Sequence, residues 1–140
     1  MKRNLLLFVV IMACVIGASA QGLKKVYDET INTKTQISSA LADAASQNKF
    51  VICQVGGNWC PWCLRFAQFI VDDAEIVSLI DKNFEYIHVN YSRSDKSEAT
   101  AETMKRLGSP QRFGFPVFVV LDAKGEVLHI QDSSFLESGN

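Results

Sequence analysis

The sequence predicts an α/β domain in which a central mixed β-sheet is flanked by helices, and three observations support this fold class. Phe50–Val55 is a nearly continuous apolar run, typical of a strand that is buried on both faces. Helical and strand-like patterns alternate along the chain, which favours helices on both sides of one sheet. The last two strand-like segments are joined by a tight turn, so the sheet should also contain an antiparallel hairpin.

The first 20 residues have the pattern of a secretory leader. Lys2 and Arg3 provide a positive start, residues 5–16 are apolar, and Ala18-Ser19-Ala20 is a small-residue cleavage signal. We therefore expect residues 1–20 to be a signal peptide.

This leader predicts an exported protein with a periplasmic location, and residues 21–140 should form the mature domain. A membrane-spanning helix is disfavoured because it would need about 20 consecutive apolar residues. The alternative is a lipoprotein anchored through Cys14, since Ile11-Met12-Ala13-Cys14 loosely matches a lipoprotein processing signal. Outside the cytosol disulfides persist, so cysteine chemistry gains importance.

Length and charge limit the number of domains and the kinds of partner that we expect. The mature chain is long enough for one hydrophobic core, and we expect a single monomeric domain. Removing Lys2 and Arg3 from the 14 basic residues leaves 12 against 15 acidic residues. Because nucleic-acid binding calls for a basic patch, we expect no nucleic-acid partner.

The first half should contain two helix–strand pairs. The sequence predicts a helix over 35–47, then the strand Phe50–Val55, then a mostly buried helix from Cys60 that carries Phe66 and Phe69. Asp73 should cap a further helix over 74–81. We expect the apolar residues of that helix to point inward, namely Ile76, Val77, Leu79 and Ile80.

The second half continues the alternation. We expect a strand over 85–90 and a helix over 97–107 that is capped by Ser97. A strand over 117–121 and a returning strand over 126–130 should be joined by the turn Asp122-Ala123-Lys124-Gly125.

The segment with the clearest chemical signal is Trp59-Cys60-Pro61-Trp62-Cys63, directly after the first strand and a Gly56-Gly57-Asn58 turn. Cysteines three apart on a first helical turn share a face, so their sulfurs can close a disulfide or open to a dithiol. Backbone N–H groups at the helix start favour an anion, so Cys60 should ionise more readily than a free cysteine. Pro61 suits the first helical position because its missing N–H is not needed there.

A second motif, Gly114-Phe115-Pro116 before the apolar run Val117–Val120, completes a pattern that resembles the thioredoxin superfamily. The Asn58–Cys63 stretch is most similar to exported thioredoxin-like proteins of bacteria. The resemblance covers about residues 38–131 and implies a thioredoxin-like fold. Such domains usually end with a helix, but Ser133–Asn140 is short and polar. We therefore expect that helix to be absent or truncated: either the sequence is cut short, or the fold leaves that face of the sheet less covered.

The resemblance implies a thiol-disulfide oxidoreductase that needs no cofactor. Cys60 would attack a substrate disulfide as a thiolate, and Cys63 would resolve the mixed disulfide; the reverse steps oxidise a dithiol. The expected partners are proteins with disulfides or dithiols and an unidentified electron donor or acceptor. The expected role is to reduce or reshuffle disulfides of exported proteins in the cell envelope.

Four more residues are implied to bind substrate. The proline that matches Pro116 is cis in relatives and faces the cysteine pair, and the backbone of the preceding residue, here Phe115, offers strand-like hydrogen bonds to an extended substrate. Trp59 matches a tryptophan that shields the pair. Trp62 is a large ring at a position that is often small, and it could form an apolar surface for substrate chains.

Gln54 is a departure from the family pattern. Many thioredoxins carry a buried aspartate six residues before the nucleophile, which takes the proton of the resolving thiol. Glutamine cannot act as a base, so we expect slower turnover here than in a cytosolic thioredoxin.

Three alternatives remain open at this stage. Cys53 should be a buried hydrophobic residue of its strand, or else a third redox thiol. Cys60 and Cys63 have metal-ligand spacing, but His88 and His129 lie within strand patterns, so we expect no metal site. The remaining alternative is a non-catalytic module that senses redox state or binds proteins.

Overall fold

The computed structural model describes residues 22–136, so the expected signal peptide, Cys14 and the last four residues lie outside the described part. No helix within 22–136 is long and apolar enough to cross a membrane. The elements in chain order are α2 (Thr33–Ser46), β1 (Phe50–Gly56), α3 (Pro61–Asp72), α4 (Ala74–Asn83), β2 (Phe84–Asn90), α5 (Glu98–Arg106), the 3-10 helix η1 (Pro110–Phe113), β3 (Val117–Leu121), β4 (Val127–Asp132) and the 3-10 helix η2 (Ser133–Leu136).

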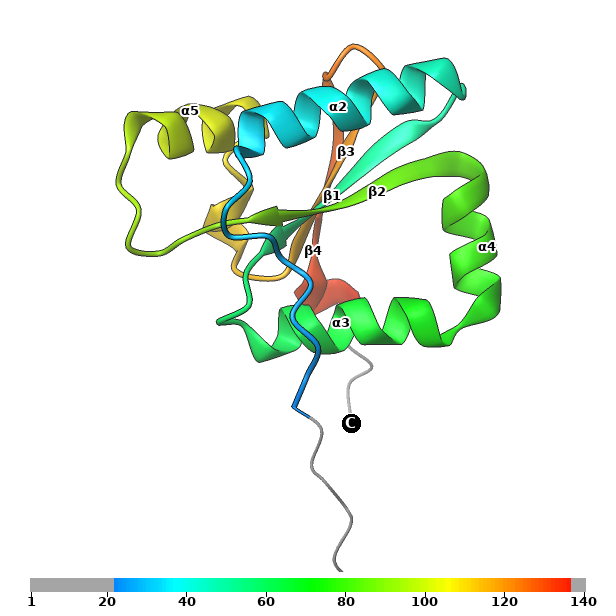
Figure 1. The fold of residues 1–140 in the computed structure, drawn as a ribbon, viewed down its shortest axis with the longest axis horizontal. Helices are drawn as coiled ribbons and strands as arrows, with labels where there is room; N and C mark the ends of the chain where they lie inside the picture. The colour runs from blue at the N-terminus through cyan, green and yellow to red at the C-terminus, as the bar shows by residue number, and fades with distance from the viewer. Residues whose placement is uncertain (1–21, 137–140) are drawn as a thin grey trace, which may run out of the picture.

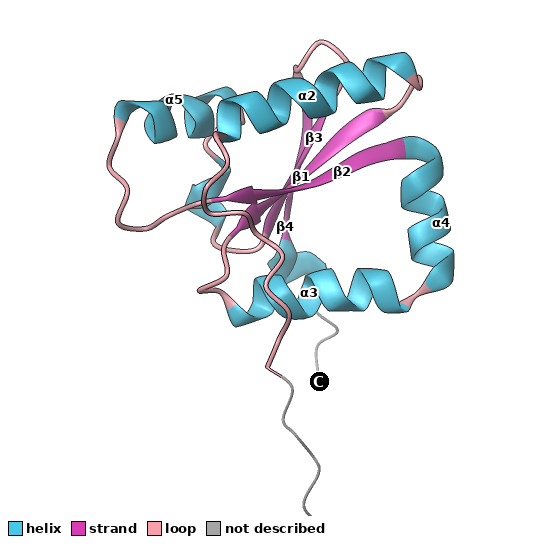
Figure 2. Cartoon of the chain, in the orientation of Figure 1, coloured by secondary structure: helices cyan, strands magenta, loops and turns pink. Residues whose placement is uncertain are grey.

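The four strands form one mixed sheet in the order β2-β1-β3-β4. β1 runs parallel to β2, and β3 runs antiparallel to both β1 and β4. Figure 1 shows α2 and α5 on one face of the sheet, α3 on the other, and α4 beyond the edge strand β2. Figure 2 shows the same layers by type of structure. The predicted α/β class, with a mixed sheet between helices, is confirmed.

The face under α2 carries the aliphatic core. Alternate residues of β1 point to this side, and their partners on β3 are also apolar: Val51 pairs with Leu121, Cys53 with Val119 and Val55 with Val117. All six are buried, and Ile37, Leu41 and Leu107 of the covering layer complete the cluster. Cys53 is thus a buried core residue of its strand, as expected, and burial raises the pKa of its thiol to about 12.

The local signals for turns and helix starts are confirmed. The Asp122 carboxylate accepts hydrogen bonds from the backbone N–H groups of Lys124 and Glu126, both at 2.9 Å, and Gly125 takes a φ of +84°. Asp73 caps α4 and Ser97 caps α5 through their side-chain oxygens. These turns fix the hairpin and the helix starts from short-range sequence alone.

The predicted burial of α4 is wrong. Leu79 is 62% exposed, and Ile76, Val77 and Ile80 are only half-buried. The reason is its position: α4 lies at the edge of the sheet and packs mainly against β2 and α3. The helix therefore has neighbours on too few sides to bury its apolar residues.

The prediction of a mostly buried helix from Cys60 is also wrong in part. Cys63, Leu64, Ala67 and Ile70 are buried, but Phe69 is 57% exposed. In the described residues, β4 is followed only by the short η2, which lies beside α3 (Figure 1).

Candidate active site

The cysteine pair stands at the start of α3. Cys60 is the N-cap residue, and its sulfur accepts a hydrogen bond from the Cys63 backbone N–H at 3.2 Å. Cys60 and Cys63 are joined in a disulfide, with Cα atoms 5.3 Å apart. Cys60 is 6% exposed, whereas Cys63 is completely buried. Cys60 is therefore the sulfur that a partner reaches first, and a helix N-terminus is available to stabilise its thiolate.

The turn between β1 and α3 holds this pair against the N-terminal segment. The Asn58 side chain accepts hydrogen bonds from the backbone N–H groups of Val26 (3.2 Å) and Tyr27 (3.1 Å). The same side chain donates to the Tyr27 carbonyl at 2.8 Å. Asn58 thus fixes the backbone of residues 26–27 beside the active-site turn.

Trp59 and Phe115 lie beside one another next to the pair. The Trp59 indole N–H donates to the Tyr91 carbonyl at 2.8 Å, and its ring meets Phe115 edge-on, with centroids 5.3 Å apart. The Arg93 guanidinium lies 3.9 Å from the centroid of the Trp59 ring. Trp59 is held on both sides, which suits the shielding role that the sequence predicts.

The Phe115–Pro116 peptide bond is cis, as expected. The Phe115 ring stacks on Tyr91, with centroids 5.1 Å apart. Phe115 is partly buried and also contacts the cluster formed by Tyr27, Cys60, Cys63 and Leu64. The predicted pairing of this loop with the cysteine turn is therefore present.

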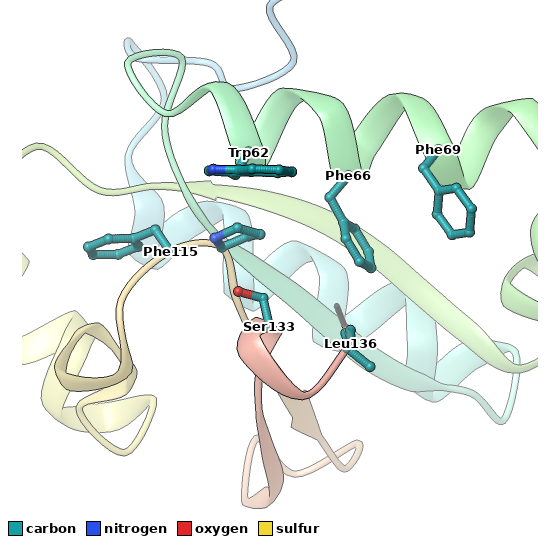
Figure 3. Close-up of a pocket in the computed structure, with 7 residues that line it drawn as sticks. Trp62, Phe66, Phe69, Phe115, Ser133 and Leu136 are labelled. Atoms are coloured by element: carbon teal, nitrogen blue, oxygen red, sulfur yellow. The ribbon is translucent and has the colours of Figure 1, made fainter. Parts of the chain in front are cut away.

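A groove runs along α3 from Trp62, which directly precedes Cys63 in the sequence. It encloses about 380 Å³, and its lining residues are Trp62, Phe66, Phe69, Phe115, Pro116, Ser133 and Leu136. In Figure 3, the aromatic rings of α3 stand on one side, with Ser133 and Leu136 of η2 opposite them and Phe115 at one end. Trp62 is 62% exposed, in agreement with the expected open ring. Trp62, Phe115 and Pro116 thus meet at one surface, while Trp59 contacts it through Phe115.

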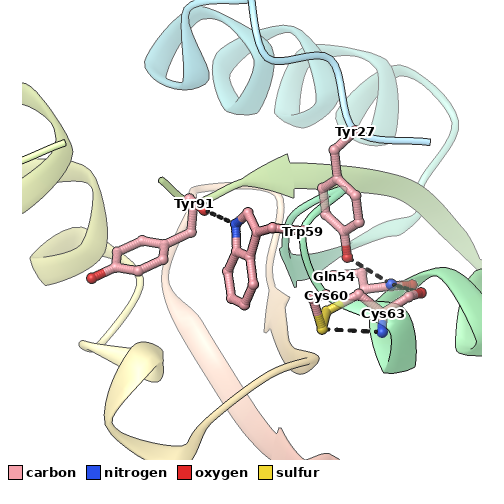
Figure 4. Close-up of a disulfide and its surroundings, with 6 residues drawn as sticks. All are labelled: Tyr27, Gln54, Trp59, Cys60, Cys63 and Tyr91. Carbon is pink, nitrogen blue, oxygen red and sulfur yellow. Dashed lines mark hydrogen bonds between the residues drawn. A yellow bond between two sulfur atoms is a disulfide. The ribbon is translucent and has the colours of Figure 1, made fainter. Parts of the chain in front are cut away.

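Beneath the disulfide lies a buried polar network centred on Gln54, which is fully buried (Figure 4). Its amide nitrogen donates to the Cys63 carbonyl (3.0 Å) and to the Tyr27 hydroxyl (2.7 Å). Its amide oxygen accepts a hydrogen bond from the Tyr86 hydroxyl. Burial raises the pKa of both tyrosines well above their usual value, so both stay protonated.

Tyr27, Asn58 and Tyr86 are site residues that the sequence reasoning missed. A polar side chain inside an apolar strand was the available signal, because a buried amide needs hydrogen-bond partners.

The two histidines do not complete a metal site with the pair. His88 lies on β2 and His129 on β4, the two edge strands, which are separated by three strand spacings or about 14 Å. The described residues contain no cluster of three or more His, Cys, Asp or Glu side chains that could hold a metal ion.

Comparison with known proteins places this geometry in a family. The family model described as "Thioredoxin-like" matches residues 32–123. The structure is similar to that of a disulphide isomerase from Xylella fastidiosa Temecula1, with a TM-score of 0.70 and 26% identity over 83% of this chain and 89% of that one.

Two further structures support the fold alone. A DsbH oxidoreductase is 19% identical (TM-score 0.52; 89% of this chain and 83% of that one), and a Thermus thermophilus thioredoxin is 23% identical (TM-score 0.50; 70% and 76%). A comparison with curated protein sequences gave no match. The family match spans more than half of the chain, and together with the Cys60–Cys63 disulfide it identifies a thiol-disulfide oxidoreductase that belongs to the thioredoxin-like family.

Proposed function

We propose that this oxidoreductase reduces or reshuffles disulfides of exported proteins in the cell envelope. The observation that carries the proposal is the disulfide at the N-terminus of α3, in which Cys60 is 6% exposed and Cys63 is fully buried. That asymmetry separates a nucleophile from a resolving thiol. Similarity to a disulphide isomerase supports reshuffling as one of the two activities.

In the proposed reaction, the Cys60 thiolate attacks a sulfur of the substrate disulfide. A bond forms from Cys60 to that sulfur, and the second substrate sulfur leaves as a thiolate. Cys63 then loses its proton and attacks Cys60, which releases the first substrate sulfur and restores the Cys60–Cys63 disulfide. The substrate gains two electrons and the pair loses two, so a further turnover needs an electron donor. In isomerisation, a thiol of the substrate itself attacks the mixed disulfide before Cys63 does.

The groove along α3 is the proposed substrate surface. One end of the groove lies at Trp62, which directly precedes Cys63 in the sequence, and the aromatic lining favours apolar side chains near the reacting cysteine of the substrate. Trp62, Phe66 and Phe69 are spaced at i, i+4 and i+7, which covers about 10 Å of helix and about three residues of an extended chain. Phe115 and Pro116 form the other wall at the reacting end. We expect unfolded or extended segments to fit this surface better than compact ones.

The proposal of an envelope location rests on the leader at residues 1–20. Expression of the complete chain in a bacterium should yield an extracytoplasmic protein that begins at Gln21, as measured by mass spectrometry of the mature form. A lipid-modified N-terminus at Cys14 would replace periplasmic release with a membrane anchor. A full-length cytosolic product would contradict the envelope proposal.

The decisive test of the activity is to trap the mixed disulfide. The reduced Cys63→Ser variant is mixed with ribonuclease that carries scrambled disulfides, and covalent complexes are analysed by non-reducing electrophoresis. We expect a covalent complex that a reductant cleaves. The Cys60→Ser variant, tested in the same way, should form no such complex. Binding to ribonuclease that survives Cys60→Ser, with no covalent complex from Cys63→Ser, would favour a non-catalytic binding module.

A further inference from the structure

The Tyr27 hydroxyl lies close to the buried sulfur of the disulfide. The position that a Cβ atom would take on Gly56 is 2.5 Å from the Cys63 sulfur and 2.7 Å from the Tyr27 oxygen. The separation between the Tyr27 oxygen and the Cys63 sulfur therefore cannot exceed the sum of those two distances. Figure 4 shows the Tyr27 side chain reaching down to the site from the N-terminal segment.

The hydrogen bonds of Gln54 fix the direction of the Tyr27 proton. A backbone carbonyl only accepts, so the atom of Gln54 that lies 3.0 Å from the Cys63 carbonyl must be the amide nitrogen. That nitrogen has two hydrogens, and the second one points at the Tyr27 oxygen 2.7 Å away. Tyr27 is therefore the acceptor in this bond, and its own O–H is directed elsewhere. Within residues 22–136 the structure gives that O–H no acceptor.

We propose that Tyr27 donates a hydrogen bond to the Cys63 thiolate when the pair is reduced, and that Gln54 positions the Tyr27 hydroxyl for this role. The inference rests on the proposed function and concerns its second step. In that step Cys63 gives its proton to solvent, its thiolate attacks the Cys60 sulfur, and the bond from Cys60 to the substrate sulfur breaks. Tyr27 keeps its proton throughout and acts only as a donor.

The surroundings explain why such a donor matters. Tyr27, Cys60, Cys63 and Leu64 form one buried cluster, where an unpaired thiolate would be costly. Burial raises the pKa of Tyr27, so its hydroxyl remains a donor across the working pH range and cannot replace the missing carboxylate base. The other titratable rings of the network are Tyr86, which donates to Gln54, and His88, whose ring meets the Tyr27 ring edge-on with centroids 5.3 Å apart.

The test separates the two steps of the reaction. The reduced mature protein is mixed with oxidised glutathione, quenched with acid at intervals and analysed by mass spectrometry, which resolves the Cys60–glutathione intermediate from the closed disulfide. In Tyr27→Phe we expect the intermediate to form at the wild-type rate. Its resolution should be about 10- to 100-fold slower, because a hydrogen bond to a charged group is lost. The pH at which resolution reaches half its maximal rate should rise.

Tyr86→Phe is the matched control, because it removes another tyrosine hydroxyl that is hydrogen-bonded to Gln54. It should affect resolution less than Tyr27→Phe does, since its hydroxyl bonds to Gln54 and not toward the sulfur. Equal slowing by both variants, or a wild-type pH profile in Tyr27→Phe, would overturn the inference. Failure of wild-type protein to form any glutathione intermediate would instead overturn the proposed function.

A second measurement uses the unsubstituted protein, so it does not depend on the folding of a variant. Tyrosine labelled with carbon-13 at Cζ gives one resonance for each of the three tyrosines, and this resonance responds to hydrogen bonding of the hydroxyl. We expect the Tyr27 resonance to move on reduction of the disulfide, and to move further as Cys63 ionises at rising pH. A Tyr27 resonance that is the same in both redox states would contradict the proposal.

Discussion

The side chains on the two faces of the sheet have different roles. The face under α2 is closed and aliphatic, and its alternate β1 residues Val51, Cys53 and Val55 are fully buried in the main core. The face under α3 carries Gln54, the polar network and the disulfide, and it ends in an exposed aromatic groove. Because neighbouring residues of a strand point to opposite faces, Cys53 and Gln54 belong to different environments one residue apart. Stability is thus concentrated on one face and chemistry on the other.

The largest expected contrast is between two cysteines on opposite faces. Cys60→Ser should abolish disulfide reduction, measured as turbidity of insulin in the presence of dithiothreitol, because the nucleophile is lost. Cys53→Ala should retain the activity, since the Cys53 thiol is buried, has a raised pKa and faces the core. It should cost only about 1 kcal/mol of stability. A loss of activity in Cys53→Ala, at normal stability, would contradict the assignment of redox chemistry to the α3 face alone.

Stability should show the reverse contrast. Ile37→Ala removes a fully buried side chain from the closed face and should lower the free energy of unfolding by about 2–5 kcal/mol in urea titrations. Phe69→Ala removes a larger side chain from the open face, yet it should change stability by no more than about 0.5–1 kcal/mol because Phe69 is mainly exposed. Similar losses in both variants would mean that the open face contributes to the core after all.

A pH effect of intermediate size is expected from His88. Burial lowers the pKa of His88, and its buried Nε2 atom has no hydrogen-bond partner. The unfolded chain therefore binds the proton more readily than the folded one. The stabilising contribution is complete above the unfolded pKa of about 6.5 and is lost as pH falls below it, with a slope of at most about 1.4 kcal/mol per pH unit.

Urea titrations between pH 7.5 and 5 measure this effect. His88→Gln should flatten the decline, whereas His129→Gln, at an exposed position on the opposite edge strand, should leave it unchanged. A decline that persists in His88→Gln would assign it to other groups and would remove the link between the polar face and acid sensitivity.

The smallest effect concerns substrate choice. In the Cys63→Ser background, Phe69→Ser should slow capture of a peptide disulfide with leucine three residues from its cysteine by about threefold, and should not slow capture of a serine-containing peptide. Val71→Ser is the matched control, because Val71 is 64% exposed on the same helix but outside the groove. Equal effects of both substitutions would show that the groove does not discriminate between substrate side chains.

Much of the fold could be predicted because its signals are local. The apolar run of β1, the caps Asp73 and Ser97, and the Asp122–Gly125 turn each depend on residues a few positions apart. The burial of α4 could not be predicted in this way, because it depends on how many elements surround the helix. An apolar pattern indicates which side of a helix faces inward, but not whether anything lies there.

The site residues likewise fall into those with a local sequence signal and those whose place depends on distant segments. The Cys-x-x-Cys spacing and the proline after Phe115 are sequence motifs, and the structure brings both to one surface. Tyr27 could not be found from its own segment, because that segment has no periodic pattern. Its place is set by Asn58, which lies 31 positions away in the sequence. The expectation of slow turnover from Gln54 stays a prediction, and the network now gives it a structural context.

The most direct test of the division between the faces is the equilibrium reduction potential of the Cys60–Cys63 pair, measured in glutathione or dithiothreitol buffers. The account predicts one reversible two-electron couple, between about −270 mV for a reductase and about −120 mV for an oxidant, that is unchanged in Cys53→Ala. A pair that shows no reversible couple, or whose couple is lost when Cys53 is replaced, would contradict the assignment of redox chemistry to the α3 face.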